Sequence, residues 1–141
     1  MEAREQFNVS LGQALAQQPT EEAFVNFIND NMVDFSDMCA DYNNPIKAER
    51  KYVVGNEIIL RIRADKIEPA SDNHSYKIIH HAINTAYVFT NEDSFSELDY
   101  PVIVWILAKY KSRYKDDLGY YYYEFTDAQL LSYGEVPLRG Y

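Results

Sequence analysis

Three histidines and one cysteine are the residues of this sequence best suited to metal binding or catalysis. They are His74, His80, His81 and Cys39. Adjacent residues on a helix point about 100° apart, so His80 and His81 cannot ligate one metal side by side, and the HExxH spacing of a helical zinc site is missing. A lone cysteine excludes an intrachain disulfide and a cysteine-based zinc site. The sequence therefore predicts no metal, no cofactor and structural histidines.

A hydrolytic site would pair one of these histidines with Asp72 or Glu92 and would need a nucleophile in a recognisable setting. The sequence contains no GxSxG motif, no Gly-rich phosphate loop and no CxxC motif. A site that assembles only in three dimensions stays open. We therefore expect a protein without catalysis, and the alternative is a small-ligand binder or small enzyme that uses His74, His80 or His81.

Four aspartates, Asp30, Asp34, Asp37 and Asp41, are spaced four, three and four residues apart. On one continuous helix they would fall within roughly 60° of one another, opposite an apolar face. Such a row is usually a solvated face that favours solubility. The sharper hypothesis is a docking strip for a basic partner, in which carboxylates stand in for phosphates. A calcium site is disfavoured because the EF-hand spacing around a glycine is missing.

Tyr120, Tyr121, Tyr122 and Tyr123 form an unbroken run in a chain that holds 13 tyrosines among 141 residues. Alternate side chains of a strand face opposite ways, so Tyr120 and Tyr122 should share one face and Tyr121 and Tyr123 the other. Tyrosine supplies contact area in interfaces at low entropic cost, but it also packs small sheets. We expect one pair in the core and the other at a partner.

The expected elements follow from apolar periodicity, capping residues and turn residues. They are a short helix through Phe7, Leu11 and Leu15 ending before Pro19, a helix over about residues 21–42 with Thr20 as N-cap and Cys39 on its apolar side, a hairpin over residues 52–62 around Gly55-Asn56, helices over residues 76–87 and 102–110, a strand over residues 120–125, and a short helix from Thr126 and Gln129 to Gly134. This order predicts the α+β class. We expect a single domain over residues 1–141, in which residues 1–45 are acidic and helical and residues 46–141 are mixed α/β.

The net charge of −9 disfavours direct binding to nucleic acid or to an anionic membrane. Residues 1–45 hold eight acids and one base, a net of −7, so the negative charge lies mostly in the N-terminal third. The N-terminus lacks the basic flank and apolar stretch of a signal peptide, and the longest apolar run is too short to span a membrane. With the single cysteine, these features predict a cytoplasmic protein.

The sequence thus favours a non-enzymatic, acidic protein-binding factor. Its most concrete form is an inhibitor, immunity or anti-defence protein that occupies the basic, nucleic-acid-binding surface of another protein, using the aspartates for steering and the tyrosines for contact energy. The main alternative is a structural or assembly protein that forms a homo-oligomer through its Tyr-rich strand.

Overall fold

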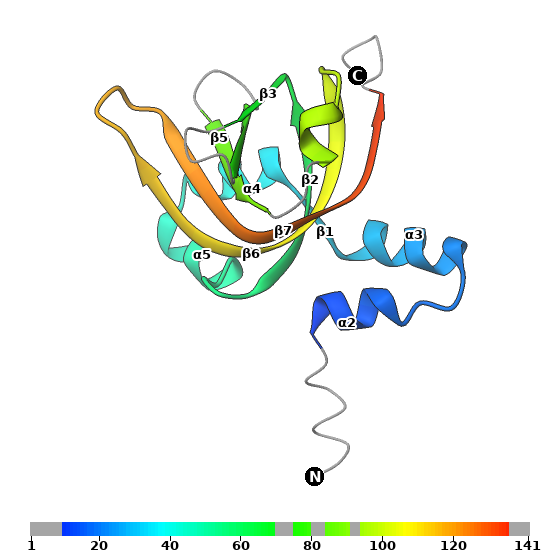
Figure 1. Ribbon diagram of the computed structural model, residues 1–141. Coiled ribbons are helices and arrows are strands. Elements are labelled where there is room, and N and C mark those ends of the chain that lie inside the picture. Colours follow the sequence, from blue (N-terminus) through cyan, green and yellow to red (C-terminus); the bar gives the residue numbers. More distant parts are fainter. Residues whose placement is uncertain (1–9, 70–74, 80–83, 91–93, 136–141) are drawn as a thin grey trace.

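The computed structural model describes residues 10–69, 75–79, 84–90 and 94–135. Seven strands form one mixed sheet with the order β1-β2-β6-β7-β5-β4-β3 (Figure 1). In sheet order they are β1 (Met32–Asp34), β2 (Glu57–Ala64), β6 (Val102–Lys115), β7 (Tyr121–Glu135), β5 (Asn84–Phe89), β4 (Ser75–Ile79) and β3 (Lys66–Pro69). β1 runs parallel to β2 and β5 runs parallel to β7, whereas the other neighbours are antiparallel.

Within the described residues, four helices and one 3-10 turn accompany the sheet: α2 (Leu11–Ala16), α3 (Glu21–Asn31), α4 (Phe35–Asp41), α5 (Pro45–Lys51) and η1 (Ser94–Glu97). The α+β class, the N-terminal helices and the C-terminal strand predicted from the sequence are confirmed. None of the helices in the described segments is long and apolar enough to cross a membrane.

The β6–β7 hairpin is the longest feature of the sheet and gives it its curvature. Its register shifts at three places, between Trp105 and Ile106, between Leu107 and Lys109, and between Tyr110 and Ser112. Each irregularity of this kind adds local twist and bends the strands. The hairpin therefore curls into a trough, with α4 on its inner side and α2 and α3 on its outer side (Figure 1).

The main core fills the inner side of the trough. Phe35 and Met38 of α4 are fully buried against alternate residues of β2 and β6, among them Leu60 and Ile106, and against Phe125 of β7. The T-shaped ring pair of Phe35 and Tyr123, with centroids 5.1 Å apart, belongs to the same core. The short α4 is thus held by tertiary packing, because a seven-residue helix has little stability of its own.

A second, smaller core lies on the outer side, where α2 and α3 cover the sheet. Leu15 and Ile28 of these helices pack on Ile59 and Leu107. Gly12 allows this close approach: a Cβ there would lie 3.1 Å from Leu107 Cδ2, and its N–H donates to Glu57 Oε1 at 3.3 Å. Both faces of β2 and β6 are therefore buried where the helices cover them.

The helix predicted over residues 21–42 is wrong as one element. Thr20 caps α3 as expected, but the helix ends at Asn31, and residues 32–34 pair with β2 as a parallel edge strand before α4 begins. Asp34 sits at this junction and caps α4 through Ser36 N–H. Residues 32–34 thus leave the helix because they gain backbone pairing with β2 and because Asp34 caps a new helix.

The hairpin predicted over residues 52–62 is half wrong. Its second strand exists as β2, but the segment before Gly55 leads out of helix α5, and β2 pairs with β6 instead. Gly55 has the expected positive φ of 94°, yet its N–H donates to Tyr110 O at 2.8 Å. The glycine turn therefore joins a helix to the sheet and docks on β6.

The helices predicted over residues 76–87, over 102–110 and after Thr126 are wrong, since the described residues of all three segments lie in strands. Alternate residues Ile78, Ala86 and Val88 are buried on β4 and β5, whereas β6 reads as a continuous apolar run because both of its faces are covered. The strand predicted over residues 120–125 is confirmed, beginning at Tyr121, and it continues to Glu135.

Shortening a buried side chain and an exposed side chain of α2 and α3 should change the stability of the fold by different amounts, because only the buried side chain belongs to the second, smaller core. Leu15, 3% exposed, should cost about 2–5 kcal/mol of unfolding free energy when changed to alanine, because a cavity replaces buried apolar contacts. Val25→Ala is the control, since this α3 side chain is 47% exposed and should change stability by no more than about 0.5 kcal/mol. Urea denaturation measures both, and equal losses would contradict the docking of α2 on the sheet.

Candidate functional site

The four aspartates do not form one row, so the predicted stripe is wrong. Asp30 belongs to the last turn of α3, Asp34 precedes α4, and Asp37 and Asp41 lie at opposite ends of α4. The break at residues 32–34 leaves Asp30 on α3, Asp34 in β1 and the other two on α4. Of the four, only Asp30 and Asp37 are exposed, and the other two are half-buried.

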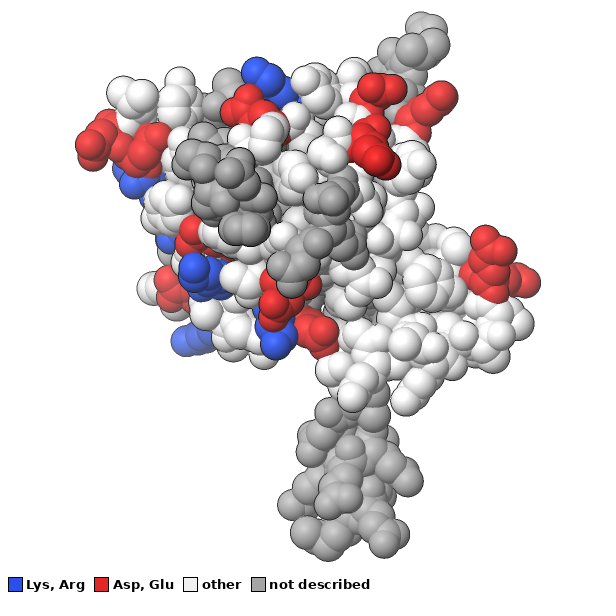
Figure 2. Space-filling view, viewed as in Figure 1, with Lys and Arg blue, Asp and Glu red and all other residues white. Residues whose placement is uncertain are grey.

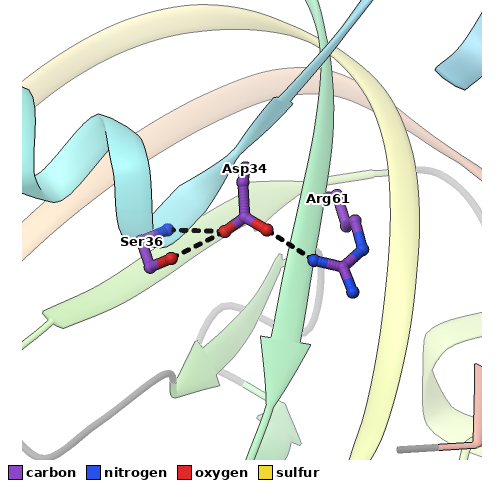
Figure 3. A network of polar contacts seen from close by, with 3 residues as sticks. All are labelled: Asp34, Ser36 and Arg61. Carbon is purple, nitrogen blue, oxygen red and sulfur yellow. Dashed lines mark hydrogen bonds and ion pairs between the residues drawn. The ribbon is translucent and has the colours of Figure 1, made fainter. Parts of the chain in front are cut away.

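Asp34 holds a structural junction (Figure 3). Its Oδ1 accepts hydrogen bonds from Ser36 N at 3.0 Å and Ser36 Oγ at 2.8 Å, and its Oδ2 pairs with Arg61 Nη1 at 2.5 Å. Partial burial acts to raise the pKa of Asp34, but the Ser36 hydrogen bonds and the Arg61 charge outweigh it, so the pKa is lowered. This carboxylate ties the start of α4 to β2 and is not available for docking.

Asp41 is engaged in a similar way at the other end of α4. It accepts hydrogen bonds from Tyr52 OH and from Lys51 Nζ, the latter at 3.1 Å. These two donors, Tyr52 first, lower the pKa of Asp41, while burial raises the pKa of Tyr52. Two of the four predicted docking aspartates therefore serve the fold.

The tyrosine run alternates as expected. Tyr123 is 1% exposed and meets Phe35 and Tyr42 edge to face in the main core, and Tyr121 packs at the margin of that core. Tyr120 is exposed just before β7, and Tyr122 lies on the outer side of the sheet. The predicted alternation is confirmed for Tyr121, Tyr122 and Tyr123, whereas Tyr120 precedes the strand, and the role of the outward residues at a partner stays a prediction.

Tyr122 belongs to a set of stacked rings that we call the outer aromatic face. Its members come from three adjacent strands and are Tyr87 and Phe89 of β5, Tyr114 of β6 and Tyr122 of β7. Tyr114 stacks on Tyr122 with centroids 5.2 Å apart and Tyr87 stacks on Phe89 at 6.0 Å, while Tyr87 and Tyr122 are 6.2 Å apart. None of the four belongs to either core cluster, and Tyr114 is 43% exposed.

Polar side chains hold and border this face. Tyr122 OH donates to Asp116 Oδ2 at 3.1 Å, and Ser112 Oγ donates to Glu124 Oε1 at 2.5 Å beside the Tyr114–Tyr122 pair. Lys111 Nζ lies 5.2 Å from the centroid of the Phe89 ring. Neighbouring side chains thus hold the rings of Tyr122 and Phe89 in place within the fold.

The inner side of the same hairpin carries a second cluster, which we call the Arg113 clamp: Arg113 with Tyr42, Tyr121 and Tyr123. Arg113 Cζ lies 4.4 Å from the ring centroids of Tyr42 and of Tyr121, and Arg113 Nε donates to Tyr123 OH at 3.1 Å. Both ring distances fall within the range of cation–π attraction. The clamp joins β6, β7 and the C-terminal end of α4.

A cysteine and a buried tyrosine pair lie beside the clamp. Burial raises the pKa of the Cys39 thiol to about 11, against a smaller opposing effect of the Tyr123 hydroxyl. Tyr42 OH and Tyr110 OH are 2.7 Å apart, and burial together with this hydrogen bond raises the pKa of Tyr110. The Cys39 thiol therefore stays neutral near pH 7, which makes it a poor nucleophile.

The sequence prediction missed the clamp because it places residues 109–115 at a helix end, with their basic side chains at the negative pole of the helix. The alternation of basic and aromatic residues in KYKSRYK is a period-two signal that indicates a strand. Such a signal could have placed Arg113 on the sheet. It could not have brought Tyr42 to it, because Tyr42 comes from a distant helix.

A cavity of about 740 Å³ lies apart from both clusters, between η1 and the end of β7. Its lining includes the carboxylates of Glu97, Asp99 and Glu135, and Figure 2 shows acidic side chains gathered over this region. No group of three His, Cys, Asp or Glu side chains is placed to hold a metal among the described residues. His74, His80 and His81 lie outside those residues, so their predicted role is not addressed.

Comparison with known proteins finds no family model that matches this chain and no curated protein with significant sequence similarity to it.

The Asp34 junction predicts a pH-dependent loss of stability. Asp34→Ala removes the α4 N-cap, worth about 0.5–2 kcal/mol, together with the Arg61 ion pair. Because folding lowers the pKa of Asp34 below its ordinary 3.8, the native carboxylate stabilises the fold above that pH and loses this effect as pH falls through the lowered pKa. Thermal unfolding at several pH values should therefore show the native protein and the variant converging in acid. Asp30→Ala is the control, and a loss as large as that of Asp34→Ala would argue against the junction.

The raised pKa of Cys39 predicts slow alkylation. At about pH 8, iodoacetamide should modify the folded protein roughly 10- to 100-fold more slowly than the urea-unfolded chain, whose thiol has a pKa of about 8.5. Mass spectrometry over time measures both rates. Equal rates would mean that the thiol is neither buried nor held neutral.

Proposed function

We propose that this chain is a non-catalytic protein-binding factor and that the outer aromatic face is its contact surface. The observation that carries the proposal is the stacking of four aromatic rings from three strands on a sheet surface that belongs to neither core. Aromatic side chains, tyrosine above all, dominate the binding energy of protein interfaces. A contiguous apolar patch of this kind with a polar border is typical of interaction sites.

The charge of the chain supports a basic partner. A net charge of −9 attracts a positively charged surface over long range and speeds encounter, even though no aligned row of aspartates exists. The exposed carboxylates of Asp30 and Asp37 contribute to this field as part of the net charge. An inhibitor, immunity or anti-defence protein that blocks the nucleic-acid-binding surface of its target is the form of this function that we favour.

The main alternative is self-association, and the strand order limits how the Tyr-rich strand could mediate it. Tyr121–Phe125 of β7 is paired on both edges, with β6 on one side and β5 on the other. This segment therefore cannot form a strand pair with its own copy. Homo-oligomerisation through this part of the Tyr-rich strand would therefore use its side chains, among them Tyr122 of the outer aromatic face.

A single pair of variants tests the surface. After the partner has been identified by crosslinking in the host, Tyr114→Ala should weaken its binding roughly 30-fold, the equivalent of about 2 kcal/mol for a hot-spot tyrosine. Tyr133→Ala is the matched control, because Tyr133 is 62% exposed at the far end of β7 and should leave affinity unchanged. Calorimetric titration measures both affinities, and thermal unfolding confirms that both variants remain folded.

Two results would contradict the proposal. Binding of Tyr114→Ala with native affinity would remove the outer aromatic face from the interface. A purified protein that is an oligomer by light scattering, and that Tyr114→Ala converts to a monomer, would assign the same face to self-association.

A further inference from the structure

The hydrogen-bond donors of Arg113 are only partly used. A guanidinium carries five N–H groups, and of these the Nε–H donates to Tyr123 OH. Among the described residues, no carboxylate lies within ion-pair distance of Arg113, and no acceptor is found for its two terminal amino groups. The guanidinium therefore presents an unused fork of donors.

Two carboxylates on the neighbouring elements, those of Asp41 and Glu124, are engaged elsewhere. Asp41 belongs to α4, which lies on the same side of the sheet as Arg113. It accepts hydrogen bonds from Tyr52 and Lys51. Glu124, on the neighbouring strand, faces the outer side and accepts from Ser112. The rings of the clamp are the neighbours that Arg113 does contact. The fold thus surrounds a cation with aromatic rings and, among the described side chains, gives it no counter-charge.

A second positive charge lies close by. Lys115 Nζ is 5.9 Å from the centroid of the Tyr121 ring, the same ring that contacts Arg113. Arg113 is only partly exposed, and charge-assisted hydrogen bonds are stronger in a site that is partly shielded from water.

We propose that the Arg113 clamp is a carboxylate-binding site. The planar fork of the guanidinium matches the two oxygens of a carboxylate, so the terminal amino groups would bind it in bidentate fashion while the tyrosine rings hold the guanidinium in place. Lys115 adds a second, exposed contact. This site lies on the opposite side of the sheet from the outer aromatic face and does not depend on the function proposed for that face.

The test is a titration followed by the Nε resonance of Arg113 in a ¹⁵N NMR spectrum, with acetate as the probe. We expect a saturable shift of this resonance, whereas the resonance of Arg61, which is already paired with Asp34, should not move. Sodium chloride at the same ionic strength is the control for screening. A shift of Arg113 that does not saturate, or that chloride reproduces, would overturn the proposal.

Variants test the two cations separately. Arg113→Lys keeps the charge but loses the fork, and it should abolish saturable acetate binding. Lys115→Ala should weaken binding by up to roughly fivefold, as expected for an exposed charge, and should leave the fold intact. Lys66→Ala is the matched control on strand β3, where Lys66 pairs with Glu68. Unchanged affinity in Lys115→Ala would contradict the placement of the site even if Arg113→Lys proved unstable.

Two further probes define the chemistry and its source. Inorganic phosphate is the second probe, because the guanidinium fork also matches two phosphate oxygens, and tighter binding of phosphate than of acetate would overturn the assignment to a carboxylate. A peptide with blocked termini and a single Asp side chain distinguishes a protein ligand from a small acid. Tighter binding of the peptide than of acetate would support a carboxylate supplied by a polypeptide, and equal affinity would support a free small carboxylate.

Discussion

The pairing of β6 with β7 is the interaction on which the rest of the structure depends. The register shifts between the two strands bend the sheet into a trough, so that the two sides of β6 pack against different elements. On the inner side Val104, Ile106 and Ala108 are buried in the main core beneath α4, and on the outer side Leu107 meets α2 and α3. The packing of α4 on one side of the hairpin, and of α2 and α3 on the other, thus depends on this bend.

The same pairing lets one hairpin carry two surfaces of different chemistry. Beyond Lys109, β6 no longer pairs with β2, and because successive residues of a strand point to opposite sides, the outer aromatic face and the Arg113 clamp lie back to back. Tyrosine suits both surfaces, since its ring packs or stacks while its hydroxyl satisfies a polar neighbour. Tyr123 combines a buried ring with a hydrogen bond from Arg113, whereas Tyr122 combines an outer ring with a hydrogen bond to Asp116.

Local chemistry in the sequence determined several features by itself. Thr20 as a helix cap, the positive φ of Gly55 and the alternation of Tyr121–Tyr123 depend on a residue and its near neighbours, and all three were predicted correctly. The α+β class followed from the same kind of signal. The acidic charge of the N-terminal third is likewise a property of composition.

Tertiary structure alone decided the elements whose neighbours are distant in the chain. Residues 32–34 leave the helical pattern because β2 offers them backbone partners, and residues 102–110 form a strand whose two covered faces remove the alternation that identifies a strand. Asp34 left the predicted docking row because Arg61 reaches it only in the fold, and the Arg113 clamp depends on Tyr42, which arrives beside it from the end of α4. Backbone pairing and burial act between residues far apart in sequence, and a pattern read along the chain contains no record of which distant partner will be present.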